Sequence, residues 1–403
     1  MTNMAKRKFL GGVLCAAMLA AMAPAGAQNA QPPIKVGLLF GFTGPAAIAA
    51  VGSLAAAKLA VKEINDAGGL LGRQLELVQA DHQFDPANTV SEARRLVQRE
   101  KVDVSFGPEA SFLAVAVGPI FAEGKIPYFS TTVSVAQTPY NFTALMSGET
   151  QAIGMLDFAA KHLKAKTIAV FADSGTVGKA LQEDVKKYAP EKGLTVTIMT
   201  DFANKTTDVT PQLLAIRKTN PDVIIHSGSL PADSAVMLKN MDEINYHPVI
   251  VSTVFGQAPR QVMELAGPDV FKSGKNWGFA LKAYTYCAKE KPGQRLFDQY
   301  LVKLKAAEPA NFEKIDAKTS LYVYEPMMVW RAAVEATKSL DGPGIVAWIE
   351  QNGSKLRGAG AGYPISYSKA SHFMWGPDAT TVVQRPDLVR AEDKLVERQT
   401  DCP

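Results

Sequence analysis

Apolar stretches alternate with amphipathic stretches along most of the chain, at the spacing of strands followed by helices. The clearest unit runs from Ile34 to Asp85. It begins with Ile34–Phe40, which is apolar enough for a strand buried on both faces. A helix follows from Pro45 to about Asp66, and a second strand begins at Leu75. This pattern predicts a right-handed βαβ unit on a parallel sheet.

The strand–helix order continues to Ser130, starts again near Thr150 and runs to Ser252. Two such blocks predict an α/β protein with two Rossmann-like lobes, each with a parallel central sheet. From Phe255 the predicted helices are longer, and after Tyr363 apolar residues alternate as in short strands. We expect a first lobe of residues 28–146 and 255–361, and a second lobe of residues 147–254 and 362–403.

The first 27 residues have the composition of an export signal. Basic residues at positions 6–8 precede the apolar run Phe9–Ala23, and a small-residue cleavage site ends at Ala27. The run is too short to span a membrane comfortably. Cys15 lacks the small residues that precede the cysteine of a lipid-anchor site. We therefore expect residues 1–27 to be a cleaved signal peptide.

The charge balance argues against two classes of partner. The formal net charge of +4 becomes +1 without the leader, which carries three basic and no acidic side chains. This balance favours neither nucleic acid nor an anionic membrane surface. No later apolar run reaches the roughly 18 residues of a membrane-spanning helix, so we expect no membrane insertion.

Two cysteines remain after removal of the leader, Cys287 and Cys402. Exported proteins fold in an oxidising compartment, so one interpretation is a disulfide that fastens the C-terminal tail. The other interpretation is a buried thiol and a separate, exposed thiol in the tail.

The sequence contains no recognisable motif for metal binding or catalysis. The five histidines are far apart, and the one small cluster, Asp81, His82 and Asp85, is best explained as shaping a loop. A nucleophile elbow, a dinucleotide fingerprint and a Walker loop are all missing. We therefore expect no cofactor, no metal and no enzyme activity.

Polar residues follow several predicted strands at their carboxyl ends, where open α/β sheets bind ligands. Ser111 lies at the predicted start of a helix, where free backbone N–H groups favour an anion. It could equally be an N-cap that stabilises this helix by about 1 kcal/mol. Thr132 and Ser134 follow the next strand and either contact the same ligand or belong to a solvated loop.

These features resemble the periplasmic binding proteins of branched-chain-amino-acid-type ABC transporters, the leucine/isoleucine/valine-binding family with the type I fold. The resemblance extends over nearly the whole mature chain. Its clearest parts are Thr43–Pro45, Glu63–Gly69, Gly72–Leu77, Asp85-Pro86, Asp208–Leu213 and Asn220–Asp222. It implies a periplasmic protein, a ligand cleft between two lobes joined by three crossovers, and a cognate membrane permease and ATPase. Because one binding protein would serve one transporter complex, the resemblance also implies a monomer.

In this family, a serine at the helix start after the third strand holds the ligand carboxylate, together with a hydroxyl and a carbonyl after the fourth strand. The resemblance assigns these contacts to Ser111, Thr132 and Ser134. Closure of the cleft is expected to add contacts from the second lobe. These contacts should come from the neighbourhood of Asp173, Val177, Ser229 and Phe255.

Amino-acid-binding members of the family place an acidic residue after the second-lobe strand that ends here at Ser252. Residues 253–257 of this chain contain no acid. A buried ammonium group without a carboxylate would cost roughly several kcal/mol. The leading hypothesis is therefore a carboxylate ligand without a free α-amino group, such as an aromatic acid. The side chains of Phe42, Phe112 and Phe255 are then either apolar walls of the site or core residues.

The alternative is that Glu109 or Asp173 replaces the missing acid, and that the ligand is an ordinary apolar amino acid.

Among function classes, the solute-binding component of an ABC importer fits best. A ligand-sensing receptor module shares the fold, and an exported enzyme is the third class. A repressor of related fold is disfavoured, because the leader occupies the place of a DNA-binding helix-turn-helix.

Overall fold

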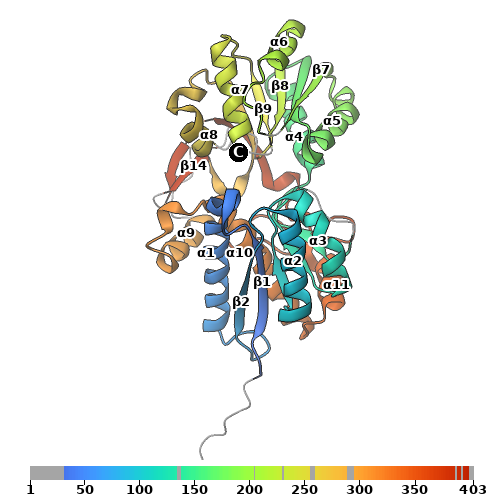
Figure 1. The fold of residues 1–403 in the computed structure, drawn as a ribbon, viewed down its shortest axis with the longest axis vertical. Coiled ribbons are helices and arrows are strands. Elements are labelled where there is room, and N and C mark those ends of the chain that lie inside the picture. The colour runs from blue at the N-terminus through green and yellow to red at the C-terminus, as the bar shows by residue number, and fades with distance from the viewer. Residues whose placement is uncertain are drawn as a thin grey trace, which may run out of the picture.

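The computed structural model describes residues 31–133, 138–203, 205–228, 231–254, 259–287, 295–385, 388–391 and 394–398. These residues form two α/β lobes, one above the other in Figure 1. The leader and four residues with predicted roles lie outside the described part of the chain: Ser134, Ser229, Phe255 and Cys402.

The first lobe contains a fully parallel sheet of five short strands. They are β1 (Ile34–Phe40), β2 (Leu75–Asp81), β3 (Val104–Phe106), β4 (Tyr128–Ser130) and β5 (Asn141–Thr143), in the spatial order β2-β1-β3-β4-β5. β1 is almost completely buried, as its apolar sequence predicts for a strand covered on both faces.

Helices cover both faces of this sheet, and they come from two distant parts of the sequence. They are α1 (Ala47–Asp66), α2 (Pro86–Arg94), α3 (Ser111–Glu123), α9 (Leu296–Ala307), α10 (Ala317–Thr337) and α11 (Gly342–Asn352). α1 packs closely along α10. A side chain at Gly52 of α1 would come within 2.7 Å of the Thr319 hydroxyl, so small residues in α1 allow the two backbones to approach.

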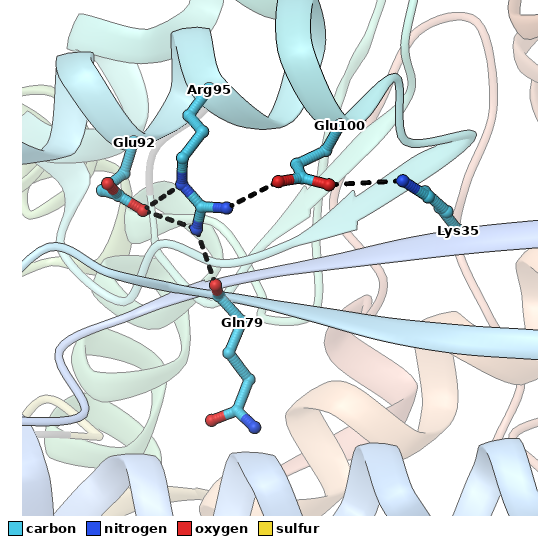
Figure 2. Close-up of polar contacts among 5 residues, drawn as sticks. All are labelled: Lys35, Gln79, Glu92, Arg95 and Glu100. Atoms are coloured by element: carbon cyan, nitrogen blue, oxygen red, sulfur yellow. Dashed lines mark hydrogen bonds and ion pairs between the residues drawn. The ribbon is translucent and has the colours of Figure 1, made fainter.

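A chain of ion pairs fastens the end of α2 and the π-helical turn after it to the sheet (Figure 2). The guanidinium of Arg95 donates to Glu92 at 2.7 Å, to Glu100 at 3.1 Å and to the Gln79 carbonyl at 2.7 Å. Glu100 accepts in turn from Lys35 of β1 at 3.2 Å. These side chains lie on helix and strand surfaces, so we assign them a structural role.

The second lobe contains a six-stranded sheet. Its strands are β6 (Thr167–Asp173), β7 (Thr195–Phe202), β8 (Val223–Ser227), β9 (Ile250–Ser252), β10 (Asn276–Leu281) and β12 (Thr380–Arg385), in the order β12-β10-β9-β8-β6-β7. All neighbours are parallel except β12, which runs antiparallel to β10. Its helices are α4 (Gly148–Asp157), α5 (Thr176–Tyr188), α6 (Thr210–Thr219), α7 (Pro231–Glu243) and α8 (Pro259–Ala266).

The second lobe extends further along the chain than the sequence analysis expected. We expected residues 255–361 to return to the first lobe, but α8 packs on α7 and β10 joins the second sheet. The return therefore occurs between β10 and α9. The final crossing is also later than expected, because Phe373 still pairs with Thr143 of β5 before the chain reaches β12. Three crossovers remain, as the resemblance implied.

A small third sheet lies between α8 and α9 in Figure 1, at the level where the lobes meet. It consists of β11 (Thr285–Tyr286), β14 (Lys394–Arg398) and β13 (Leu388–Ala391), in that spatial order. Cys287 follows β11 directly and is disulfide-bonded. None of the described helices combines the length and apolar character needed to cross a bilayer.

Candidate functional site

The carboxyl edges of the two main sheets face the boundary between the lobes. β5 ends at Thr143, and the chain enters the second lobe with α4 at Gly148. β10 ends at Leu281, and the chain then returns toward α9. Because the strands of each sheet are parallel apart from β12, both exits place the carboxyl ends of the strands at this boundary. Loops at such edges are the usual ligand-binding position in open α/β sheets.

The start of α3 provides unpaired polar groups at this edge. The N-cap of α3 is Ala110, which has no side chain able to cap the helix. Ser111 is the first helical residue, is half-buried, and its hydroxyl bonds to none of the described residues. Ser111 is therefore not an N-cap, and the first backbone N–H groups of α3 remain available to an anion.

A tight turn between β3 and α3 sets the position of Ser111. Gly107 has φ +97°, and a side chain there would come within 2.0 Å of the Leu39 carbonyl. Its N–H donates to the Phe129 carbonyl at 2.8 Å, and the Pro108 carbonyl accepts from Thr131 at 3.0 Å. Only glycine fits this close approach of neighbouring strands, so the turn fixes where α3 begins.

Glu109, one of the two proposed replacements for the missing acid, is held within the first lobe. One carboxylate oxygen accepts from the Gly41 N–H at 3.1 Å. The other lies 2.9 Å from Nε2 of His82, which is fully buried. Since Nδ1 of His82 accepts from the Phe84 N–H at 3.0 Å, Nε2 carries the proton and donates to Glu109. Both oxygens of Glu109 are thus engaged at the ends of β1 and β2.

Asp81, His82 and Asp85 do shape loops, as the sequence analysis expected. Asp81 accepts from the Thr43 hydroxyl at 2.7 Å, and Asp85 is the N-cap of α2. The pairing of His82 with Glu109 was missed. These residues are far apart in the sequence, and no local pattern indicates that their strand ends are neighbours.

Thr132 also bonds mainly within the first lobe. It is buried, and its hydroxyl lies 3.0 Å from that of Ser130. Its backbone N–H donates to the Thr143 hydroxyl at 3.1 Å, and its carbonyl accepts from the same hydroxyl. These bonds tie the ends of β4 and β5 together.

The two described phenylalanines of the predicted apolar walls differ in their surroundings. Phe42 is half-buried, packs against the main core and meets Phe40 edge-on at 6.2 Å between ring centroids. Phe112, the second residue of α3, is 48% exposed and meets Phe84 edge-on at 5.8 Å. Phe112 is therefore not a core residue, whereas Phe42 is partly one.

The second lobe contributes Asp173 and Val177 to the boundary. Asp173 ends β6 and is fully buried, and one of its oxygens accepts from the Gly175 N–H at 3.0 Å. Its other oxygen has no hydrogen-bond partner among the described residues. Val177 lies in the first turn of α5, half-buried against the core. α5 contacts α3 of the first lobe, so the start of each helix lies beside the boundary.

Among the residues that the structure describes, no group of histidine, cysteine and acidic side chains could hold a metal ion. The described polar groups at the boundary are hydroxyl, amide, imidazole and carboxylate groups. This chemistry suits binding of a small polar molecule.

Comparison with known proteins identifies the family. The family model described as periplasmic binding protein matches residues 33–384. The chain belongs to this family. The match covers both lobes up to β12, and it ends before β13 and β14.

Individual relatives are distant. The chain is 28% identical over 286 residues to a protein from Brucella suis named Leu/Ile/Val-binding protein homolog 7, covering 68% of this chain and 70% of that protein. Solved structures also share the fold. The substrate-binding protein LivJ of Streptococcus pneumoniae, in complex with isoleucine, has TM-score 0.70 at 18% identity over 90% of this chain and 97% of its own. A solute-binding protein of Rhodopseudomonas palustris, in complex with 4-hydroxybenzoate, has TM-score 0.73 at 20% identity over 92% and 96%.

Proposed function

We propose that this protein is the periplasmic solute-binding component of an ABC importer. It binds a small carboxylate-bearing ligand between the lobes, and hinge closure then buries the ligand. The closed form presents both lobe surfaces to a cognate permease and ATPase. Export to the periplasm with cleavage near Ala27 is part of the same proposal.

The uncapped start of α3 is the observation that carries the proposal. A helix of this length favours an anion at its N-terminus, through its free N–H groups and its dipole. The hydroxyl of Ser111 lies beside these groups and is free to donate to a carboxylate. Ser111 is therefore the principal ligand contact that we propose, with Thr132 and Ser134 as its neighbours on the next loop.

The favoured ligand is an aromatic or other apolar carboxylic acid without a free α-amino group. Glu109 is already engaged by His82 and Gly41, which leaves it poorly suited to an ammonium group. Residues 253–257 contain no acid, and Phe112 offers an exposed aromatic surface near Ser111. The Rhodopseudomonas palustris protein bound to 4-hydroxybenzoate shows that this fold accommodates such ligands.

An apolar amino acid is the alternative ligand, and Asp173 supports it. One oxygen of this buried carboxylate lacks a partner among the described residues, and an ammonium donor would satisfy it. The LivJ structure with isoleucine shows the same fold with an amino acid. A ligand-sensing receptor module is the alternative from another class, because it uses the same binding step.

A thermal-shift screen of the purified mature protein tests the proposal. The panel contains leucine, isoleucine, valine, phenylalanine, benzoate, hydroxybenzoates and phenylpropanoid acids. A ligand present at 100 times its dissociation constant adds about 2.7 kcal/mol of stability and raises the midpoint by several degrees. A shift with aromatic acids alone supports the favoured ligand. A shift with leucine or valine replaces it with the amino-acid alternative and points to Asp173.

A further inference from the structure

The crossover strand that leaves β10 is buried and hydrogen-bonded, which is unusual for a hinge segment. Thr285 and Tyr286 of β11, and Tyr284 before them, are each at most 2% exposed. Hinge residues in two-lobed proteins are ordinarily a few loop positions that absorb changes in backbone angles. Residues 284–286 are instead packed on more than one side.

Two side chains at the start of α9 hold this strand on the first lobe. The Tyr286 hydroxyl donates to the Asp298 carboxylate, which also accepts from the Arg295 N–H at 3.0 Å. The Arg295 guanidinium donates to the Thr285 carbonyl and to the Lys282 and Ala283 carbonyls at 2.8 and 3.1 Å. It also lies over the Tyr286 ring, with its carbon 4.7 Å from the centroid.

The C-terminal hairpin holds the other edge of the same strand. β14 pairs in parallel with β11, so that Thr285 opposes Glu397 and Tyr286 opposes Arg398. β13 and β14 form an antiparallel pair that continues from β12, the outer strand of the second-lobe sheet. The crossover strand is therefore fixed between an element of the first lobe and an extension of the second.

This hairpin lies beyond the part of the chain that matches the family model. The family match ends at residue 384, and both strands of the hairpin come later. Cys287, the residue after β11, is disulfide-bonded. Of the two other cysteines in the sequence, Cys15 belongs to the predicted leader, and Cys402 follows the end of β14 by four positions. Register and chain length thus favour Cys402 as the partner.

We propose that the C-terminal hairpin and a Cys287–Cys402 disulfide form a brace on the hinge, which limits the range of lobe orientations in the free protein. A parallel pairing of two residues on each strand is short, and a covalent bond beside it keeps the strands together. The consequence for ligand affinity rests on the proposed binding function. A restrained hinge leaves less conformational freedom to lose on closure, so the brace should strengthen binding.

The first test needs no ligand. Peptide mapping of the unreduced mature protein should recover Cys287 and Cys402 in one cross-linked species. Treatment with a dithiol should convert this species to two peptides with free thiols, while the dithiol is oxidised to its own disulfide. Amide exchange in residues 282–287 should then rise by about ten-fold or more in Cys402→Ser, while exchange in β8 stays unchanged. Recovery of Cys402 as a free thiol, or unchanged exchange in residues 282–287, would overturn the proposal.

A second variant keeps the test valid if Cys402→Ser does not fold. Tyr286→Phe retains the ring but removes the bond to Asp298, and it leaves both cysteines in place. It should raise amide exchange in residues 282–287, and dithiol treatment should raise this exchange further.

For whichever acid of the screening panel binds, Cys402→Ser should weaken affinity by about five-fold or more. If Cys402→Ser binds the acid as tightly as the parent protein although residues 282–287 exchange faster, the brace stabilises the hinge segment only. That result would overturn its proposed effect on binding. A panel without any binder would count against the proposed function and leave the exchange result standing.

Discussion

At the scale of single residues, Ser111 is the side chain on which the proposed site depends most. It differs from an ordinary N-terminal serine, because Ala110 occupies the capping position and the Ser111 hydroxyl is left without a partner among the described residues. Removal of this hydroxyl should therefore lower ligand affinity more than it lowers the stability of α3. This separation makes the role of Ser111 measurable.

Ser111→Ala should weaken carboxylate binding by about 1–3 kcal/mol, the cost of losing one hydrogen bond to a charged group. The unfolding midpoint without ligand should stay close to that of the parent protein, since no capping bond is lost. Titration calorimetry with the acid selected by the screen measures the first effect. Ser354→Ala, at an exposed serine that makes no hydrogen bond with described residues, is the matched control. Equal affinities in the two variants would remove Ser111 from the site.

Glu325 of α10 gives a prediction about pH. Its carboxylate is buried and accepts N–H bonds from Ala359 at 2.7 Å, from Gly360 at 2.8 Å and from Ala361. Burial raises the pKa of this carboxyl from its usual 4.5 to about 7, although the three N–H donors oppose the rise. The contribution of Glu325 to stability is therefore complete below pH 4.5 and is lost as the pH rises through 7.

Between these two values, Glu325 should lower the free energy of unfolding by up to about 1.4 kcal/mol per pH unit. Glu325→Gln does not titrate, so its stability should fall less steeply over the same range. Denaturant unfolding at pH 5, 6 and 7 compares the two slopes, and other titrating groups cancel in the comparison. Parallel curves for the two proteins would show that the carboxyl keeps an ordinary pKa in the folded state.

At the scale of elements, the start of α5 is positioned by direct contact with the end of β6. A side chain at Gly178 would come within 1.8 Å of the Asp173 carbonyl, which is backbone and cannot give way cheaply. Gly178→Ala should therefore displace α5 and cost about 1–3 kcal/mol of stability. Ligand affinity should fall as well, because Val177 and Asp173 would move.

Gly148→Ala is the matched control for this change. Gly148 begins α4, and an added side chain there would meet nothing within 4 Å. Thermal unfolding of both variants, followed by calorimetry with the same acid, gives the comparison. If Gly178→Ala is as stable as Gly148→Ala, the contact between α5 and β6 is looser than the structure indicates.

The sequence predicted single elements better than their assembly. β1 and α1 were recognisable from local sequence alone. β1 is one continuous apolar run, and Pro45 marks the start of the helical segment that contains α1. β5 was missed, since three residues are too few to carry a pattern. β10 was found at the right residues but assigned to the first lobe, because the choice of sheet depends on its pairing with β9 and β12. The same limit applies to the site. The helix start at Ser111 was predicted from local sequence, whereas the partner of Glu109 required the strand order.

At the scale of the whole molecule, the three crossovers and the facing sheet edges favour a hinge motion. A saturating ligand should draw the lobes together and reduce the radius of gyration of the mature protein. Small-angle scattering with and without the selected acid measures this change. Ser111→Ala at the same ligand concentration provides a control with reduced occupancy. An unchanged radius at proven saturation would exclude hinge closure as the response to binding.

The packing of α1 on α10 also has a consequence for the time at which this protein folds. α10 ends about 270 residues after α1 in the sequence. At about 5–20 residues per second, roughly 15–50 s of synthesis separate the two helices. Until then, the face of α1 that packs on α10 has no partner, and the core of the first lobe stays incomplete. Under the export that we propose, this delay is an advantage, because the chain remains unfolded and able to pass through a narrow translocation channel while it is still being made.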